Sequence, residues 1–176
     1  IQKIGISNGR ITYKDKGYVE GQLLNQFSMD ENNGFLRVAT TTDEWTHGGH
    51  IQYNNVFVLD KNMGIVGKIT GIAKNEKIYS TRFMGDRLYM VTFKKVDPFF
   101  VIDLSDPKNP EVLGELKIPG YSDYLHPYNE NYIIGIGKDA IDNGDFALFQ
   151  GVKVALFDVR DVNNPKLVDS IVIGDR

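Results

Sequence analysis

The feature that most constrains this chain is a stretch of sequence that occurs more than once. Residues 100–120 read FVIDLSDPKNPEVLGELKIPG, and residues 156–174 read LFDVRDVNNPKLVDSIVIG. When the two stretches are aligned without a gap, Asp103 falls on Asp158 and the Asn-Pro pairs that follow coincide. A chain that repeats a strand, a turn and a second strand in this way is built from one structural unit used several times.

A third copy of the same pattern lies earlier in the chain. Residues 56–71 read VFVLDKNMGIVGKITG, and Asp60 takes the place of Asp103. The turn of this copy is shorter, so Gly67 aligns with Gly114. The glycine after the turn is therefore shared by the copies at residues 56–71 and 100–120.

The segments between these copies also correspond to one another. Residues 23–40, 78–93 and 120–137 each read as a strand, a polar turn and a strongly apolar strand. The unit is therefore four strands in about 43 residues. We place the copies at about 22–71, 72–119 and 120–174, after an N-terminal hairpin in residues 1–21.

This period and strand number predict the blades of a β-propeller. The run Leu88–Val91 is apolar on both faces, as expected for a strand covered on both sides by neighbouring sheets. A β-sandwich also has short, regularly spaced strands, but it does not require internal repetition. We therefore predict an all-β fold, a portion of a β-propeller with about three four-stranded antiparallel blades plus the hairpin.

The first residues predict a tight hairpin, because Asn8-Gly9 separates two short apolar-polar runs and favours a two-residue type I′ turn. This hairpin would be the outer strand pair of a preceding blade. Closed propellers have roughly four to eight blades, and about three blades with a hairpin cannot close. The sequence thus predicts either one piece of a longer propeller or a homodimer whose copies complete each other.

The repeated turns contain acidic residues that we interpret as structural. An aspartate at the start of a turn can accept hydrogen bonds from the turn amides, and a proline fixes φ. A residue needed once in each blade is more consistent with holding the blade together than with chemistry. The predicted turn residues are Asp60, Asp103, Asp106, Asp158 and Asp161.

Composition excludes several classes of protein. The chain has 176 residues, a net charge of −3 and no cysteine. There is thus no basic surface for nucleic acid, no disulfide and no thiolate metal site. No apolar run approaches the ~20 residues of a membrane-spanning helix. No nucleotide-binding or hydrolase motif occurs, so we predict no cofactor.

The longest strings of the repeat resemble a known family. LLNQFSMDENNGFLRVATTT and the sequence from VFVLDKNMGIVGKITG to YSDYLHPY are similar to the secreted bacterial and archaeal β-propeller family that is distantly related to WD-40 repeats. The resemblance covers about residues 18–158. It implies an extracellular or cell-surface location and a longer parent protein, but no catalytic residues. The Trp-Asp pair of WD-40 repeats does not occur, since Trp45 is the only tryptophan.

Two insertions stand out between the second and third strands of a unit. They are DEWTHGGHIQYNN at residues 43–55 and KDAIDNGDFALFQG at residues 138–151. Both connections leave the same face of a propeller, and loops on a rigid scaffold often carry recognition. The alternative is that they only lengthen their hairpins. The candidate partner-binding residues are Trp45, His47, His50, Phe146 and Phe149.

Metal binding is a weaker hypothesis for the same insertions. His47 and His50 could both ligate one ion, but a third ligand is not evident. Asp142 and Asp145 have the composition of a calcium loop without its spacing. We therefore predict no metal centre and keep these four residues as candidates.

The function that the sequence favours is a non-enzymatic extracellular or cell-surface module. It would bind a protein or a polysaccharide through the loops of one face. The alternative is a fragment of a propeller hydrolase or lyase whose axial site needs further blades. The polar residues that the innermost strands offer for such a site are Asn25, Arg82 and His126.

Overall fold

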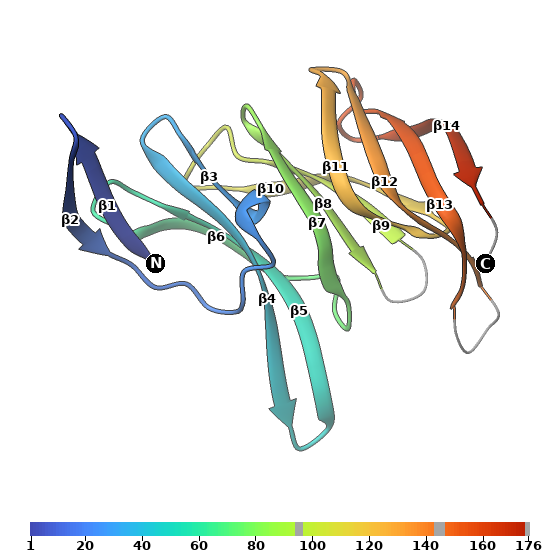
Figure 1. Cartoon of the computed structure of the whole chain (residues 1–176). Helices are drawn as coiled ribbons and strands as arrows, with labels where there is room; N and C mark the ends of the chain where they lie inside the picture. Colours follow the sequence, from blue (N-terminus) through green and yellow to red (C-terminus); the bar gives the residue numbers. More distant parts are fainter. Residues whose placement is uncertain (94–96, 143–146, 175–176) are drawn as a thin grey trace.

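The computed structural model describes residues 1–93, 97–142 and 147–174, and it confirms the all-β prediction. An N-terminal hairpin precedes three four-stranded antiparallel sheets, which lie side by side in Figure 1. In each sheet the strands follow one another in chain order. This meander is the architecture of a propeller blade.

The hairpin consists of β1 (Gln2–Ser7) and β2 (Arg10–Lys16). Between them, Asn8 and Gly9 have φ angles of 50° and 72°. Both residues occupy the left-handed region that a type I′ turn requires, and Asn and Gly tolerate it best. The local turn chemistry therefore determines this element.

We call the three sheets blades 1, 2 and 3. Blade 1 contains β3 (Met29–Asn32), β4 (Phe35–Thr46), β5 (Gly49–Leu59) and β6 (Ile65–Ile72), preceded by the 3-10 turn η1 (Gln26–Ser28). Blade 2 contains β7 (Lys77–Met84), β8 (Arg87–Phe93), β9 (Asp97–Asp103) and β10 (Glu111–Ile118). Blade 3 contains β11 (Tyr121–Asn129), β12 (Tyr132–Asp142), β13 (Ala147–Asp158) and β14 (Lys166–Ile173).

The core lies between the blades rather than inside one sheet. Blades 1 and 2 share a cluster that includes Val58 and Met90, and blades 2 and 3 share one that includes Val101 and Phe157. Each central strand of blade 2 therefore contributes side chains to two cores. This explains why its sequence does not alternate between apolar and polar residues.

The first strands of neighbouring blades lie against one another. Ser80 Oγ on β7 donates to the carbonyl of Ser122 on β11 at 2.6 Å. Ser28 at the start of blade 1 shares a 2.8 Å hydrogen bond with Thr81 on β7. These contacts join the first strand of blade 2 to the start of blade 1 and to the first strand of blade 3.

The repeated aspartates lie in the turns between third and fourth strands. Asp103 Oδ1 accepts from the Ser105 amide at 3.1 Å, and Asp106 Oδ1 accepts from the Lys108 amide at 2.9 Å. Asp60 Oδ1 accepts from two amides of its shorter turn. The corresponding bonds of blade 3 join Asp158 to the Arg160 amide and Asp161 to the Asn163 amide.

The same turns pack against the preceding blade. A Cβ atom on Gly67 would lie 2.1 Å from the carbonyl oxygen of Pro107, in the turn of blade 2. A Cβ atom on Gly114 would lie 2.4 Å from the carbonyl oxygen of Val162, in the turn of blade 3. The glycine of the repeat is thus required because the next turn takes the space of a side chain.

The two ends of the stack differ. The hairpin lies next to blade 1, where Ile1 packs against a cluster that includes Phe57 and Leu59, and Lys3 Nζ donates to the carbonyl of Lys61 at 2.8 Å. At the other end, the outer face of blade 3 holds an open apolar hollow of about 390 Å³. Its lining residues are Tyr128, Ile134, Val154, Ala155, Leu156, Asp169, Ser170 and Ile171.

Candidate functional site

The first insertion forms an arm that projects from blade 1. Strands β4 and β5 continue their pairing past the sheet as far as Thr46 and Gly49, as Figure 1 shows. Gly49 has a φ angle of 111°, which only glycine adopts readily, and it allows the tight reversal at the tip. We call residues 43–52 the arm.

The register of the arm gathers four side chains on one of its faces. Asp43 lies opposite Gln52, and Trp45 lies opposite His50. Directly opposed residues, and residues two apart in a strand, share a face of a β-ribbon. We call Asp43, Trp45, His50 and Gln52 the arm cluster.

The contacts within the arm cluster are specific. The rings of Trp45 and His50 have centroids 4.9 Å apart. His50 Nε2 lies 3.0 Å from Asp43 Oδ1, and Gln52 Nε2 donates to the same oxygen at 2.6 Å. The hydrogen bond from Gln52, assisted by His50, holds the pKa of Asp43 below its ordinary value.

Trp45 is the most exposed large side chain of this cluster. It is 84% exposed, although it carries a large apolar surface. Isolated apolar residues on a surface are common, but an aromatic ring held by a neighbour and surrounded by polar groups is typical of an interaction site. The arm cluster therefore presents an apolar platform beside an amide and a carboxylate.

The opposite face of the arm is attached to the body of the protein. The hydroxyl of Tyr53 donates to Glu44 at 2.6 Å and lies 3.0 Å from Glu20, near the start of blade 1. The hydrogen bond to Glu44 is the main cause of the raised pKa of Tyr53. These bonds orient the base of the arm, so that the arm cluster faces away from this anchor.

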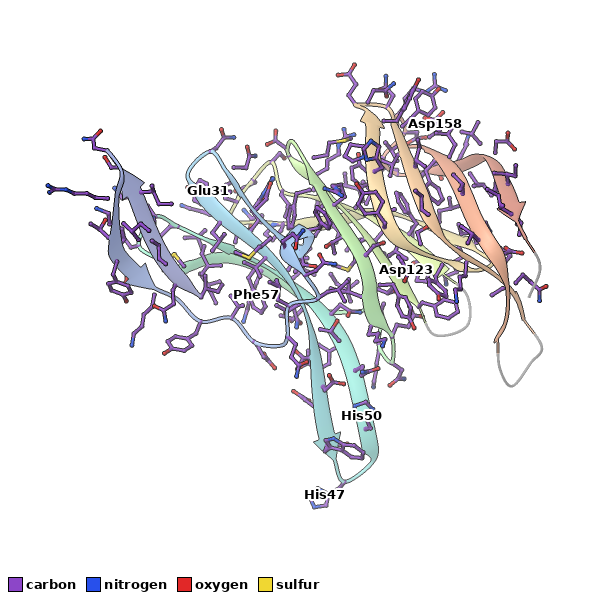
Figure 2. All side chains as sticks on the ribbon, in the orientation of Figure 1. Glu31, His47, His50, Phe57, Asp123 and Asp158 are labelled. Atoms are coloured by element: carbon purple, nitrogen blue, oxygen red, sulfur yellow. The ribbon has the colours of Figure 1, made fainter. Side chains whose placement is uncertain are left out.

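The other candidate binding residues have different positions. His47 lies at the tip of the arm, beyond His50, in Figure 2. Phe146 lies outside the described residues, and Phe149 is described only as part of the backbone of β13. The structure thus joins Trp45 and His50, while sequence reasoning missed Asp43 and Gln52. Asp43 lies two residues before Trp45 and Gln52 two residues after His50, and this spacing in a β-hairpin indicates that all four side chains share one face.

The candidate metal ligands are not assembled into a site within the described residues. His50 contacts Asp43, and no group of three His, Asp or Glu side chains suited to a metal ion occurs there. Asp145 lies outside the described residues, and only the backbone of Asp142 is described. The metal hypothesis therefore gains no geometric support from these residues.

The polar residues of the innermost strands form a chain of contacts. Arg82 stacks its guanidinium 4.0 Å from the ring centroid of Phe27 and donates through Nε to the carbonyl of Leu125 at 2.8 Å. Tyr124 lies 5.1 Å from the same guanidinium and packs edge-to-face on Phe27, and its hydroxyl is 3.1 Å from Nδ1 of His126. Asn25 Oδ1 accepts from the Phe27 amide at 2.9 Å.

These contacts give Arg82 a role in joining blades. The guanidinium contacts an aromatic residue before blade 1 and another on blade 3, and both contacts are favourable for a cation. The aromatic partners Phe27 and Tyr124 were not among the sequence candidates. Their distance from Arg82 in the chain leaves no local signal for the contact.

Comparison with known proteins finds similar sequences in archaea. Two archaeal relatives are similar: uncharacterised protein MJ1554 of Methanocaldococcus jannaschii is 56% identical over 87% of this chain, and an uncharacterised protein of Archaeoglobus fulgidus is 45% identical over 94% of it. The matches cover 23% and 25% of those relatives, so the chain spans about a quarter of their length. In the described residues, no helix is long and apolar enough to cross a membrane.

The family assignment covers the whole chain. The profile of the beta propeller domain matches residues 1–176. Its extent includes the hairpin, the arm and all three blades. The chain therefore belongs to the β-propeller domain family.

Proposed function

We propose that the chain is a non-enzymatic binding module that acts outside the cell or at its surface. The partner is a protein or a polysaccharide, and the arm cluster contacts it. The observation that carries the proposal is the 84% exposure of Trp45 on an arm that projects beyond the sheet. The resemblance to secreted β-propeller proteins supports the location.

The arrangement suits binding without chemistry. Trp45 offers a ring face, while Asp43 and Gln52 offer fixed acceptor and donor groups beside it. Aromatic residues of this kind supply much of the binding energy of interfaces, because they bury a large area at a small entropic cost. The hydrogen bonds of Asp43 reduce the ordering that a partner must impose.

The alternative function is that of an enzyme fragment with an axial site. The contact of His126 and Arg82 with the same Tyr124 ring favours it, because these groups meet on the inner strands. Arg82, however, is held by Phe27 and Leu125, so its packing contacts compete with any substrate. This geometry favours the binding module.

The experiment that tests the proposal measures retention on cell envelopes. Envelopes isolated from Methanocaldococcus jannaschii are incubated with the purified chain, pelleted and assayed for bound protein. We expect Trp45→Ala to reduce the bound fraction about ten-fold or more, the usual effect of losing an aromatic anchor.

The matched control is Tyr18→Ala, which removes an exposed aromatic side chain outside the arm. This variant should bind like the unchanged chain. Equal retention of the chain and of Trp45→Ala would exclude the arm cluster as the binding surface. A chain that stays in the supernatant would contradict an envelope partner.

A further inference from the structure

A second hollow lies between blades 2 and 3. Comparison with the equivalent boundary between blades 1 and 2 shows which side chain fills this space there. The hollow has a volume of about 470 Å³. The lining residues are Met84, Gly85, Asp86, Arg87, Tyr89, Glu130, Asn131 and Arg160. They come from the β7–β8 turn, the β11–β12 turn and the turn after β13. We call this hollow the inter-blade pocket.

The inter-blade pocket lies on the side of the molecule away from the arm. Figure 2 places Asp158, two residues before Arg160, at the edge opposite His47. A ligand in this pocket would therefore be separate from a partner of the arm cluster. The inference drawn from it is independent of the proposed function.

Because the blades repeat, the boundary between blades 2 and 3 can be compared with the boundary between blades 1 and 2. Arg37 on β4 pairs with Val58, and Tyr89 on β8 pairs with Val101. Val58 and Val101 each lie two residues before the repeated aspartate of their blade. Arg37 and Tyr89 therefore occupy equivalent positions at successive blade boundaries.

At the boundary of blades 1 and 2, the arginine fills the space itself. Arg37 is only 3% exposed and forms an ion pair with Asp30. Its Nη1 donates to the carbonyl of Gly85, in the first turn of blade 2, at 2.7 Å. The guanidinium also lies 5.1 Å from the ring centroid of Phe83. The contacts with Gly85 and Phe83 join blade 1 to blade 2, and the ion pair with Asp30 orients the guanidinium for them.

At the boundary of blades 2 and 3, a tyrosine takes the place of this arginine. Tyr89 is fully buried and stacks on Phe99 with 5.8 Å between centroids. Its hydroxyl is buried and has no hydrogen-bond partner within the described residues. Leaving such a group unpaired is unfavourable, and the adjacent hollow is large enough for a small molecule.

The groups around the pocket supply donors for that molecule. Arg87 forms no ion pair within residues whose side chains are described. Arg160 is held by Asp158 through Nε and Nη2, and its Nη1 group donates to none of the described residues. The Tyr89 hydroxyl and these guanidinium groups are all hydrogen-bond donors, and the acceptor oxygens of an oxyanion match them.

Two carboxylates limit the charge of the ligand. Asp86 accepts from Asn32 Nδ2 at 3.2 Å, and Glu130 is exposed at the surface. A polyanion would be repelled by both. We infer that the inter-blade pocket binds a small oxyanion, either a free carboxylate or phosphate. The oxyanion accepts a hydrogen bond from the Tyr89 hydroxyl and forms an ion pair with Arg87.

The test is thermal unfolding in potassium phosphate and in potassium acetate, each compared with potassium chloride at equal ionic strength. For the unchanged chain, one of the two oxyanions should raise Tm by roughly 3–6 °C at about ten times its Kd. Tyr89→Phe keeps the ring and removes the hydroxyl, so its Kd for that anion should be weaker by about ten-fold to a hundred-fold. Its Tm in chloride should not fall, because the lost hydroxyl has no partner.

Two further variants separate this inference from general salt effects. Arg87→Gln should weaken the anion-dependent rise while the protein remains folded. Tyr128→Phe removes an exposed hydroxyl on the outer face of blade 3 and should behave like the unchanged chain. Phosphate stabilises many proteins by exclusion from their surface, so the decisive quantity is the difference between variants.

Three outcomes would overturn the inference. The first is an equal rise of Tm in the unchanged chain and in Tyr89→Phe. The second is no rise with either oxyanion. The third is a lower Tm of Tyr89→Phe in chloride, which would mean that water or protein already satisfies the hydroxyl.

Discussion

At the scale of single residues, similar side chains have different roles because their surroundings differ. Arg37 and Arg82 are both held between blades, the first by Asp30 and a turn carbonyl and the second by two aromatic rings. A guanidinium suits both places, since it donates several hydrogen bonds in one plane and also stacks. Arg160, by contrast, pairs with an aspartate of its own turn.

The turn aspartates make a prediction about stability at this scale. Asp103 accepts hydrogen bonds from the amide and the hydroxyl of Ser105. Asp103→Ala should therefore lower the free energy of unfolding by about 1 kcal/mol, because the turn amide loses its acceptor. Urea denaturation monitored by far-ultraviolet circular dichroism measures this difference.

Asp103→Asn is the matched variant, since its amide oxygen can still accept from the backbone. It should lose less stability than Asp103→Ala. An unfolding curve of Asp103→Ala that superimposes on that of the unchanged chain would reject the stabilising role.

At the scale of elements, one blade is locked to the next through a turn and a glycine. The β13–β14 turn takes the space above Gly114 on β10. In β14 the equivalent position holds Asp169, which pairs with Leu156 as Gly114 pairs with Val101. No described blade packs on Asp169, and its side chain is exposed. Among the described blades, this position is therefore a glycine only where the turn of a following blade packs on it, as at Gly67 and Gly114.

This difference predicts that an alanine substitution has different effects on stability at the two positions. Gly114→Ala should lower the free energy of unfolding by roughly 1–3 kcal/mol, since its Cβ would meet two carbonyl oxygens of the next turn within 3 Å. Asp169→Ala should change stability little. Chemical denaturation of the two variants compares them, and equal losses would contradict the proposed lock.

At the scale of the whole molecule, both ends of the stack expose apolar surface. One face of the hairpin pairs Ile6 with Ile11, and both side chains are more than 70% exposed. On the outer face of blade 3, Ile171 is 60% exposed beside the apolar hollow. Contiguous apolar faces of this kind drive association of soluble proteins.

We therefore expect the chain to self-associate as its concentration rises. Size-exclusion chromatography with light scattering over a concentration series measures the mass. Ile6→Lys and Ile171→Lys should shift the equilibrium toward the monomer, because each places a charge on an apolar end. Val112→Lys, a change at an exposed site on β10, should have little effect. A monomer at every concentration would contradict this expectation.

The sequence by itself determined the elements and their order. The strand-turn-strand repeat predicted three four-stranded units, and Asn8-Gly9 predicted the hairpin turn. These predictions were confirmed because turn chemistry and the pattern of apolar residues depend on neighbours in the chain. The positions of the turn aspartates were predictable for the same reason.

Only the tertiary structure decided which side chains meet across elements. The register of two long strands assembled Asp43, Trp45, His50 and Gln52, whereas the sequence had singled out Trp45 and His50. The stacking of blades left the Tyr89 hydroxyl buried beside a hollow at the position that Arg37 fills one blade earlier. Such contacts join residues far apart in the chain, and their distances are determined by the packing of whole sheets rather than by local sequence.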